Sequence, residues 1–422
     1  MRAVTITRFV LLVAVVLLAL PAAAQMSVPA YAAVTTGGLT LFDADQIVEI
    51  ATPPHRAIFR PTWSPDGAKL AYIISDDGWA QHLVVSDTAG GVFTLEAGPL
   101  EAGFPPAWTP DGDIIYIGQG EFPTDANDPY LASVKRIKPE ADAQPVTIGK
   151  FAFVVGCGGG SPLPTDWQYW SEAGFGGANL TLAWTDYGLL HSTQCSGLGL
   201  ALLDLNTGDD ISLQGELPQS VNDHAQSGIG RAALSPDGQQ VAAVHWMYTE
   251  TGPVYELVTA DLAARTVTTI PTAVEPDQVA WGPEGTIFFS ARAYVRDVLA
   301  DYSRDELAAL KPVIDPTISL SGYEVSIHQV EPATGSSQIV YSGDAYAIGR
   351  MALAADGQTL LFSQIPNLDG WVQAIVDGRL DPLAADADHR AYVPIALLIL
   401  RLGSGEDAAF DGYRSQFALR PA

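Results

Sequence analysis

The sequence has few cysteines and few positive charges, and each shortage excludes a class of function. Its 422 residues include two cysteines, Cys157 and Cys195, so it has no CxxC redox pair and no zinc site built from cysteine pairs. Lysine and arginine number 21 against 48 aspartates and glutamates, a formal net charge of −27. Nucleic acids and anionic membranes attract cationic proteins. We therefore expect no nucleic-acid partner.

Local catalytic signatures are also missing from the sequence. It has no GxSxG elbow, no HExxH zinc motif and no GxxxxGK[ST] phosphate loop, and its seven histidines include no pair at metal-ligand spacing. We therefore name no catalytic residue and no metal ligand, and an enzyme is the less favoured class. We expect no cofactor, although acidic stretches such as residues 367–370 leave calcium as a weak alternative.

The N-terminus carries an apolar run that is short for a membrane span. A basic segment ending at Arg8 precedes the apolar residues Phe9 to Leu20, and the small residues of Pro21-Ala-Ala-Ala24 follow. A span needs about 20 apolar residues, so this order of parts predicts a signal peptide over residues 1–24, with no membrane span after cleavage. Cleavage leaves 19 basic and 48 acidic residues, a net charge of −29. We expect an exported protein that is periplasmic, on the cell surface or extracellular.

The most frequent feature of the sequence is a repeated tight turn between two apolar segments. The clearest copy lies within Phe59 to Ile74, where Ser64-Pro-Asp-Gly67 separates two strand-like runs. In six copies the acidic turn residue stands at positions 66, 111, 186, 237, 284 and 356, with spacings of 45, 75, 51, 47 and 72. The short spacings match the roughly 40–50 residues of one propeller blade.

A second hairpin follows each turn, which predicts four-stranded antiparallel blades in an all-β propeller. The tryptophans Trp63, Trp108, Trp184 and Trp281 are expected to wedge between neighbouring blades. The six turns favour six blades. The alternative is seven, because residues 39–50 already resemble an outer hairpin and residues 415–419 would supply the inner strand of a split blade. We assign 25–38 to a linker and 39–422 to a single propeller domain.

These repeats carry a family resemblance. The Trp-Ser-Pro-Asp-Gly pattern before a short aliphatic strand resembles the TolB-like, WD40-like propeller repeats of exported bacterial proteins, over roughly Leu39 to Phe410. The resemblance implies a disc-shaped scaffold for protein partners or ligands, which in some members is fused to a hydrolase domain. No residues remain here for such a domain.

Three insertions interrupt the repeats, at about 151–194, 292–320 and 366–394. The first holds Cys157, and Cys195 follows it, so an oxidising compartment predicts a disulfide between them. Its aromatic residues Trp167, Tyr169 and Trp170 form either a stacking platform for sugar or peptide, or a loop packed on a blade edge. In the second, a capping-box spacing predicts a helix or helical pair from about 292 to 311.

Three arginines occupy one position of the repeat. Arg60, Arg231 and Arg350 each stand six residues before the turn acid, where the innermost strand begins. Arginine forks suit carboxylates and phosphates, so we expect an anion site at the channel mouth, for example for the acidic tail of a partner. The alternative is a set of ion pairs between blades.

Together these features predict an exported, monomeric, non-catalytic scaffold that binds a protein partner or small ligand at the channel mouth or insertion loops. Two other classes stay open. One is a propeller hydrolase or lyase acting on glycans or small esters, and the other is a structural protein of the cell surface.

Overall fold

The computed structural model describes residues 30–35, 38–43, 46–53, 57–75, 81–95, 98–101, 103–121, 129–154, 180–194, 199–215, 217, 227–311, 320–381, 383–384, 391–409 and 414–421. The expected signal peptide, the two cysteines and the three aromatic residues 167, 169 and 170 lie outside these residues, so their assignments stay predictions.

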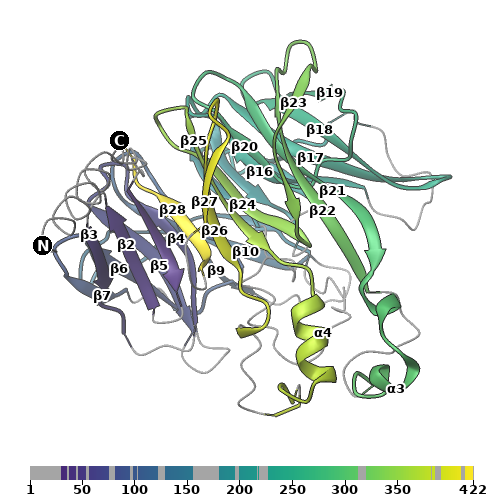
Figure 1. The fold of residues 1–422 in the computed structure, drawn as a ribbon. Coiled ribbons are helices and arrows are strands. Elements are labelled where there is room, and N and C mark those ends of the chain that lie inside the picture. Colours follow the sequence, from purple (N-terminus) through teal and green to yellow (C-terminus); the bar gives the residue numbers. More distant parts are fainter. Residues whose placement is uncertain are drawn as a thin grey trace, which may run out of the picture.

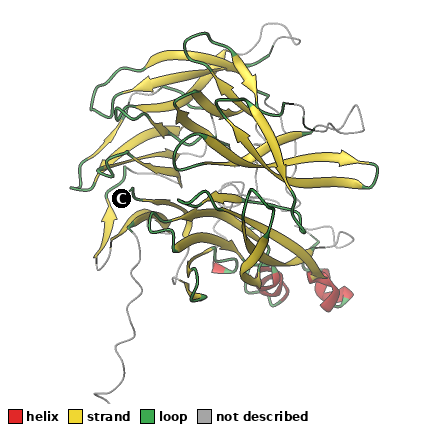
Figure 2. Ribbon diagram, turned by 90° about the horizontal axis from the view of Figure 1, so that it is seen from above, coloured by secondary structure: helices red, strands yellow, loops and turns green. Residues whose placement is uncertain are grey.

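Seven four-stranded antiparallel sheets form the described part of the chain (Figures 1 and 2), and we number them as blades 1 to 7. Blade 1 contains β4 (Ala57–Trp63), β5 (Lys69–Ser75), β6 (Gln81–Asp87) and β7 (Val92–Thr94). Blade 2 contains β8 (Ala107–Trp108), β9 (Ile114–Glu121), β10 (Leu131–Ile137) and β11 (Val146–Ala152). Blade 3 contains β12 (Leu182–Thr185), β13 (Gly188–Ser192), β14 (Leu200–Leu203) and β15 (Asp210–Ser212).

The remaining blades follow in chain order, except that blade 7 joins the two ends. Blade 4 contains β16 (Gly228–Leu234), β17 (Gln240–Thr249), β18 (Gly252–Asp261) and β19 (Thr266–Ile270). Blade 5 contains β20 (Val279–Trp281), β21 (Ile287–Asp297), β22 (Ser321–Val330) and β23 (Ser337–Asp344). Blade 6 contains β24 (Ala347–Leu353), β25 (Thr359–Ile365), β26 (Ala396–Arg401) and β27 (Glu406–Ala409). Blade 7 contains β28 (Arg414–Leu419), β1 (Tyr31–Thr35), β2 (Gly38–Asp43) and β3 (Gln46–Ile50).

Blade 7 corrects the expectation of six blades, and the seven-bladed alternative is the one observed. Its order is β28-β1-β2-β3, so the C-terminus supplies the inner strand and the N-terminus the other three. The first two strands of this blade are far apart in sequence, so no tight turn joins them. Counting turns therefore misses this blade. The expected linker over 25–38 is also wrong where β1 forms, because Tyr31 to Val34 are buried in the blade.

The ring closes through contacts between neighbouring blades. The inner strand β28 contacts both β24 and β4, which brings blade 6, blade 7 and blade 1 together. Each of the seven interfaces between neighbouring blades holds its own cluster of buried hydrophobic residues. The second strands bury both faces, as Leu70 packs toward blade 7 and Ala71 toward blade 2. A single blade cannot bury both faces, so the closed ring is what stabilises the sheets.

The tight turns and their tryptophans fold as the repeat predicts. Ser64 Oγ donates to Asp66 Oδ1 over 2.6 Å, Asp66 Oδ1 accepts the backbone N–H of Ala68 over 3.0 Å, and Gly67 has a φ of 63°. Between blades, Trp63 Nε1 donates to the carbonyl of Ala418 over 3.0 Å. Trp63 thus links blade 1 to blade 7, which confirms the expected wedging position for this residue.

The long connections share one face of the disc. Because the strands of each blade are antiparallel, the start of the inner strand and the loop between the second and third strands lie on the same side. We call this side the insertion face. It carries η1 (Val298–Asp301) and α3 (Arg304–Leu307) on blade 5 and α4 (Asp369–Val376) on blade 6. Figure 1 shows α3 and α4 near each other at one end of the blades.

The helix expected over 292–311 is correct only in its second half. Residues 292–297 continue β21, because they pair with residues 321–325 of β22. The capping box is present: Ser303 accepts the N–H of Glu306, and the Glu306 side chain accepts the N–H of Ser303. The apolar spacing that indicated a helix before residue 298 also suits a long twisted strand, and cross-strand pairing decides between them.

Candidate functional site

The arginine position of the repeat can be followed around the ring. Trp108 of blade 2 donates its indole N–H to the carbonyl of Thr62, as Trp63 of blade 1 donates to Ala418. Ala418 of β28 therefore corresponds to Thr62 of β4, and Gln416 corresponds to Arg60. The position reads, from blade 1 to blade 7, Arg60, Pro105, Leu180, Arg231, Gln278, Arg350 and Gln416. Arg350, Gln416 and Arg60 are consecutive around the ring.

A β-bulge shapes each inner strand that carries one of these arginines. The pairing register shifts between Phe59 and Thr62 in blade 1, and again around Arg231 and Arg350 in blades 4 and 6. Arg60 and Arg231 have φ values of 55° and 52°, the left-handed region that favours glycine. A bulge re-aims a side chain out of the regular pleat, so these arginines leave the alternation that would bury them between blades.

Arg231 forms an ion pair between blades, which is the alternative to an anion site at this position of the repeat. Its guanidinium binds the Asp277 carboxylate and also donates to the Asp277 carbonyl over 3.1 Å. Asp277 comes just before β20 of the next blade. It also acts on Arg292 of β21, whose guanidinium lies 5.0 Å from the ring centre of Tyr323 and 5.7 Å from that of Tyr346. Burial acts to lower the pKa of Arg292, but Asp277 and these tyrosines outweigh it and raise the pKa.

Arg60 and Arg350 have no such carboxylate. Among the described residues neither guanidinium forms an ion pair or a hydrogen bond. Burial, and then the positive charge of Arg350, lowers the pKa of Arg60 to about 10. Burial also lowers the pKa of Arg350. Arg350 acts on Arg60 although the two residues belong to blades 6 and 1. Both stand on inner strands, β4 and β24, which each contact β28 around the central channel of the propeller.

The repeat explains why these two arginines lack a partner. Arg231 binds the residue seven positions before the turn acid of the following blade, Asp277. For Arg60 the corresponding residue is Phe104, and for Arg350 it is Ser415. Neither residue is acidic. Arg60 and Arg350 therefore have no carboxylate at the position from which Asp277 binds Arg231.

Strand β28 lies between the two unpaired arginines and contacts both. Arg60 donates its backbone N–H to Gln416 Oε1 over 2.6 Å, and the Arg350 guanidinium lies 5.8 Å from the ring centre of Phe417. Gln416 is 9% exposed, and no described residue accepts a hydrogen bond from its Nε2. Sequence reasoning missed Gln416, because blade 7 has no turn from which to count. Aligning β28 with the other inner strands would have found it.

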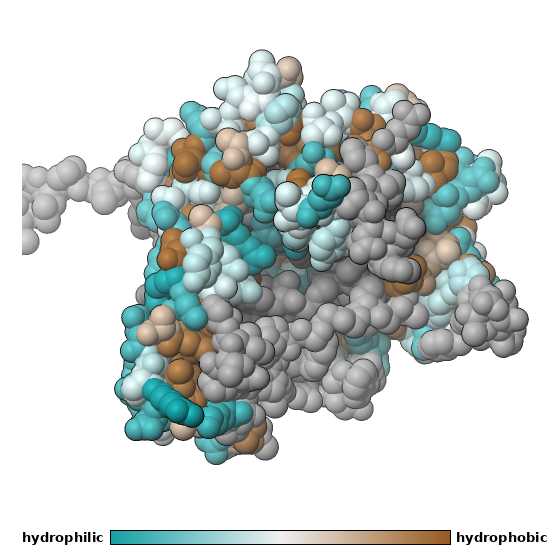
Figure 3. All heavy atoms as spheres, turned by 90° about the vertical axis from the view of Figure 1, so that its right-hand side faces the viewer, coloured by the Kyte–Doolittle hydropathy of each residue, from teal (hydrophilic) through white to brown (hydrophobic). Residues whose placement is uncertain are grey.

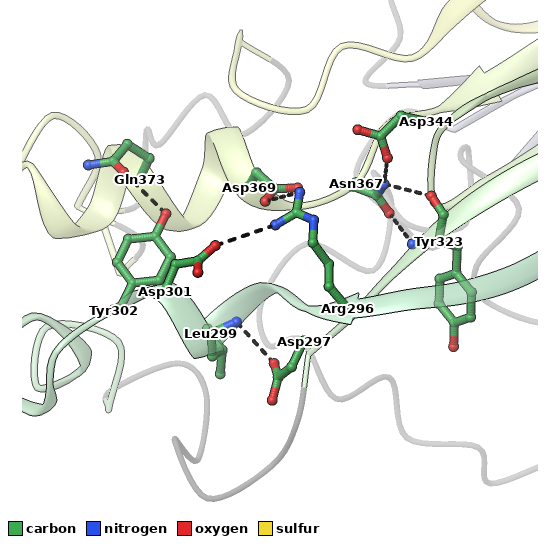
Figure 4. A network of polar contacts seen from close by, with 10 residues as sticks. All are labelled: Arg296, Asp297, Leu299, Asp301, Tyr302, Tyr323, Asp344, Asn367, Asp369 and Gln373. Atoms are coloured by element: carbon green, nitrogen blue, oxygen red, sulfur yellow. Dashed lines mark hydrogen bonds and ion pairs between the residues drawn. The ribbon is translucent and has the colours of Figure 1, made fainter.

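The insertions beside this ring are docked to each other. Figure 4 shows Arg296 of β21 reaching Asp369 of α4 over 2.6 Å and Asp301 of η1 over 4.0 Å. The hydrogen bond and charge of Asp369 raise the pKa of Arg296. Beneath this network Val298, Trp371 and Val372 share one buried core. The insertions of blades 5 and 6 therefore pack as one unit on the insertion face.

The stretch 367–370, which had suggested calcium, has structural contacts. The Asn367 side chain accepts the N–H of Tyr323 over 3.0 Å and donates to the Tyr323 carbonyl over 2.9 Å and to Asp344 over 2.5 Å (Figure 4). Asp369 pairs with Arg296. Within the described residues, no group of three or more histidines, cysteines, aspartates or glutamates is placed to hold a metal ion.

An acidic groove of about 510 Å³ lies where the two insertions meet. It is lined by Val298, Asp301, Tyr302, Glu306, Asp369, Gly370 and Gln373. Burial, followed by the nearby carboxylates, raises the pKa of Tyr302, whose hydroxyl donates to Gln373 over 3.2 Å. Figure 3 views the molecule from the right-hand side of Figure 1 and shows hydrophobic residues scattered among hydrophilic ones on that side. No described helix has the length and apolar character to cross a membrane.

The closed ring of seven sheets defines this protein as a seven-bladed β-propeller with its helical insertions on one face. No family model matches the chain. Similar solved structures include TolB from Acinetobacter baumannii, with 14% identity and a TM-score of 0.40 over 73% of this chain and 62% of that one. They also include oligogalacturonate lyase from Vibrio parahaemolyticus, with 10% identity and a TM-score of 0.48 over 79% of this chain and 80% of that one.

Among curated proteins, the chain is 32% identical over 104 residues to the uncharacterized peptidase YuxL of Bacillus subtilis (strain 168). This match spans 22% of the chain and 16% of that protein. The presence of TolB among the solved neighbours agrees with the resemblance to TolB-like repeats. Likenesses of this size concern the fold and carry no argument about the site.

Proposed function

We propose that this protein is an exported, non-catalytic scaffold that binds a protein partner or small ligand through an anionic group at the centre of the insertion face. The observation that carries the proposal is the pair Arg60 and Arg350. Arg60 is half-buried and Arg350 is exposed, both stand on inner strands that contact one another around the ring, and neither has a carboxylate among the described residues. In a chain with 48 acidic residues, this arrangement is favourable when an external anion supplies the missing charge.

A comparison of matched variants tests this proposal. Arg60→Gln with Arg350→Gln removes two cations without leaving a carboxylate unpaired, whereas Arg231→Gln leaves Asp277 without its partner. We expect the double variant to keep its thermal stability and to lose its ligand. The Arg231 variant should unfold more easily, by about 1–3 kcal/mol, and keep the ligand. The thermal unfolding midpoint reports stability, and capture from the exported protein fraction of the native organism, followed by mass spectrometry, reports binding.

Two outcomes would contradict binding through Arg60 and Arg350. The first is capture of the same partners by wild type and double variant, which would place binding elsewhere, for example on the insertion loops. The second is a double variant that unfolds as readily as the Arg231 variant, which would make all three arginines structural.

The hydrolase or lyase alternative has one source of support. It is the local similarity over 104 residues to the uncharacterized peptidase YuxL. Screening the mature protein against ester and oligogalacturonate substrates would favour this alternative if turnover followed the protein through purification and vanished in Arg60→Gln with Arg350→Gln.

A further inference from the structure

We infer that Arg60, Gln416 and Arg350 form a cradle for a doubly charged tetrahedral oxyanion of the phosphate class. This inference rests on the proposed function and specifies the chemistry of its anion. The three residues come from three consecutive inner strands, β4, β28 and β24. We call them the inner-ring cradle.

The orientation of the Gln416 amide is fixed by one hydrogen bond. Its Oε1 accepts the backbone N–H of Arg60 over 2.6 Å, and an N–H donor leaves no choice about which amide atom faces it. The amide nitrogen, with its two N–H donors, is therefore the free end of the side chain. It belongs to a residue that is 9% exposed and has no acceptor among the described residues. Its two N–H donors are therefore available to a ligand, and a bound oxyanion would accept hydrogen bonds from them.

The cradle contains donors and no free acceptor. The two guanidiniums and the amide nitrogen only donate, and the one side-chain oxygen of the cradle is occupied by Arg60. A ligand group with hydroxyls or amines would bring donors that find no acceptor here. A fully deprotonated oxyanion is the chemical group that brings acceptors alone.

The number and placement of the donors favour a phosphate group over a single carboxylate. A carboxylate has two oxygens in one plane and one negative charge, which one arginine fork satisfies. The cradle has two positive charges and three donor groups on strands from three blades. A phosphate monoester carries nearly two negative charges near pH 7 and presents three oxygens in different directions. It therefore matches the cradle in both charge and number of acceptors.

The net charge of the molecule opposes the approach of an anion to the cradle. The protein has a formal net charge of −27, so it repels anions at long range. At 0.15 M ionic strength the screening length is about 8 Å, which suppresses this repulsion while the contacts inside the cradle persist. The binding measurement should therefore be made at this ionic strength.

The decisive variant is Gln416→Glu. It keeps an oxygen to accept the Arg60 N–H and keeps the shape of the side chain, but it replaces the amide donor with a negative charge between two arginines. Its folding should be unharmed, because the new carboxylate gains cationic neighbours. Gln278→Glu is the matched control, since Gln278 is at the same position of blade 5.

The experiment is calorimetric titration of the mature protein with inorganic phosphate, glycerol 3-phosphate, acetate and succinate. We expect phosphate to bind at least tenfold more tightly than acetate, and Gln416→Glu to weaken phosphate binding at least tenfold while Gln278→Glu does not. Tighter binding of glycerol 3-phosphate than of phosphate would identify a phosphorylated molecule as the ligand, and the reverse would identify free phosphate.

The outcomes separate this inference from the proposal on which it rests. If succinate or acetate binds as tightly as phosphate, or if Gln416→Glu binds phosphate like wild type, the phosphate cradle is wrong and the anion-binding scaffold stands. If wild type binds none of the four anions, both are overturned.

Discussion

At the scale of single residues, identical amino acids at one position of the repeat have different roles. Arg231 and Arg60 share a left-handed backbone and a place on the inner strand, yet Arg231 binds Asp277 and Arg60 has no carboxylate among the described residues. The difference comes from the neighbouring blade, which presents Asp277 in one case and Phe104 in the other. The role of each arginine is therefore set by its neighbour.

Substitution by glycine separates backbone strain from charge pairing at these two sites. A non-glycine residue in the left-handed conformation costs about 1–2 kcal/mol of stability. Glycine removes this cost, but the greater freedom of the unfolded chain offsets about 0.5–1 kcal/mol of the gain. We expect Arg60→Gly to raise the free energy of unfolding by about 0.5–1 kcal/mol and to weaken anion binding. Arg231→Gly gains the same backbone relief but leaves Asp277 unpaired, so we expect a net loss of about 1–2 kcal/mol. Urea unfolding measures both, and equal changes in the two variants would contradict this account.

At the scale of elements, the tight turns are stabilised by ionised aspartates. Asp237 Oδ1 accepts the hydroxyl of Ser235 over 2.6 Å and the N–H of Gln239 over 3.1 Å. These bonds favour the charged carboxylate and lower the pKa of Asp237 below its ordinary value of 3.8, as equivalent bonds do for Asp66. The capping box of α3 and the Arg296 network fix the insertions in the same way, by pairing charged side chains with nearby backbone or opposite charge.

The lowered pKa of Asp237 gives the turn a defined pH dependence. The folded state binds a proton less readily than the unfolded state, so the contribution is present above pH 3.8 and is lost as the pH falls through the folded pKa. We expect Asp237→Asn to be less stable than wild type at pH 6, with the difference shrinking as the pH is lowered below 4. Urea unfolding at a series of pH values measures the difference.

The matched control for this turn is Asp209→Asn, an exposed acid whose carboxylate accepts no hydrogen bond from a described residue. It should change the unfolding free energy little at any of these pH values. A stability gap for Asp237→Asn that stayed constant from pH 6 to pH 3 would mean that the charge of Asp237 has no part in holding the turn.

At the scale of the whole molecule, one strand closes the ring. β28 pairs with β1 and contacts the inner strands of both neighbouring blades. Phe417 is fully buried in the interface with blade 6. Beyond the strand, Arg420 donates to the Gly67 carbonyl over 2.8 Å and pairs with Asp43 over 3.2 Å. Blade 7 thus joins the two ends of the chain and also supplies the middle residue of the inner-ring cradle.

Removal of residues 414–422 should open the ring. Loss of Phe417 alone costs about 3–5 kcal/mol, and the inner edge of β1 and two blade interfaces become exposed. We expect the cooperative unfolding transition to be lost or shifted strongly downward in calorimetry, with partial recovery when a peptide of residues 414–422 is added. Removal of residues 421–422 alone is the control and should leave the transition in place. A truncated protein that unfolds like wild type would show that closure by β28 is dispensable.

The class of fold could be predicted from the amino-acid sequence, because the repeated turns and alternating apolar runs have a local physical cause. Ser64 to Gly67 form a turn through contacts within the turn itself. The strands beside this turn are apolar and become buried. The sequence also marked Arg60, Arg231 and Arg350 as an unusual set, and it offered both a binding and a structural interpretation for them.

The tertiary structure decided the number of blades and the environment of each arginine. The seventh blade joins strands some 380 residues apart, and no local pattern records such a pairing. Likewise, Gln416 meets Arg60, and Asp277 meets Arg231, only because neighbouring blades place them together. A turn is an interaction between adjacent residues and can be read from the sequence. A contact between blades depends on how the ring closes, and closure is a property of the whole chain.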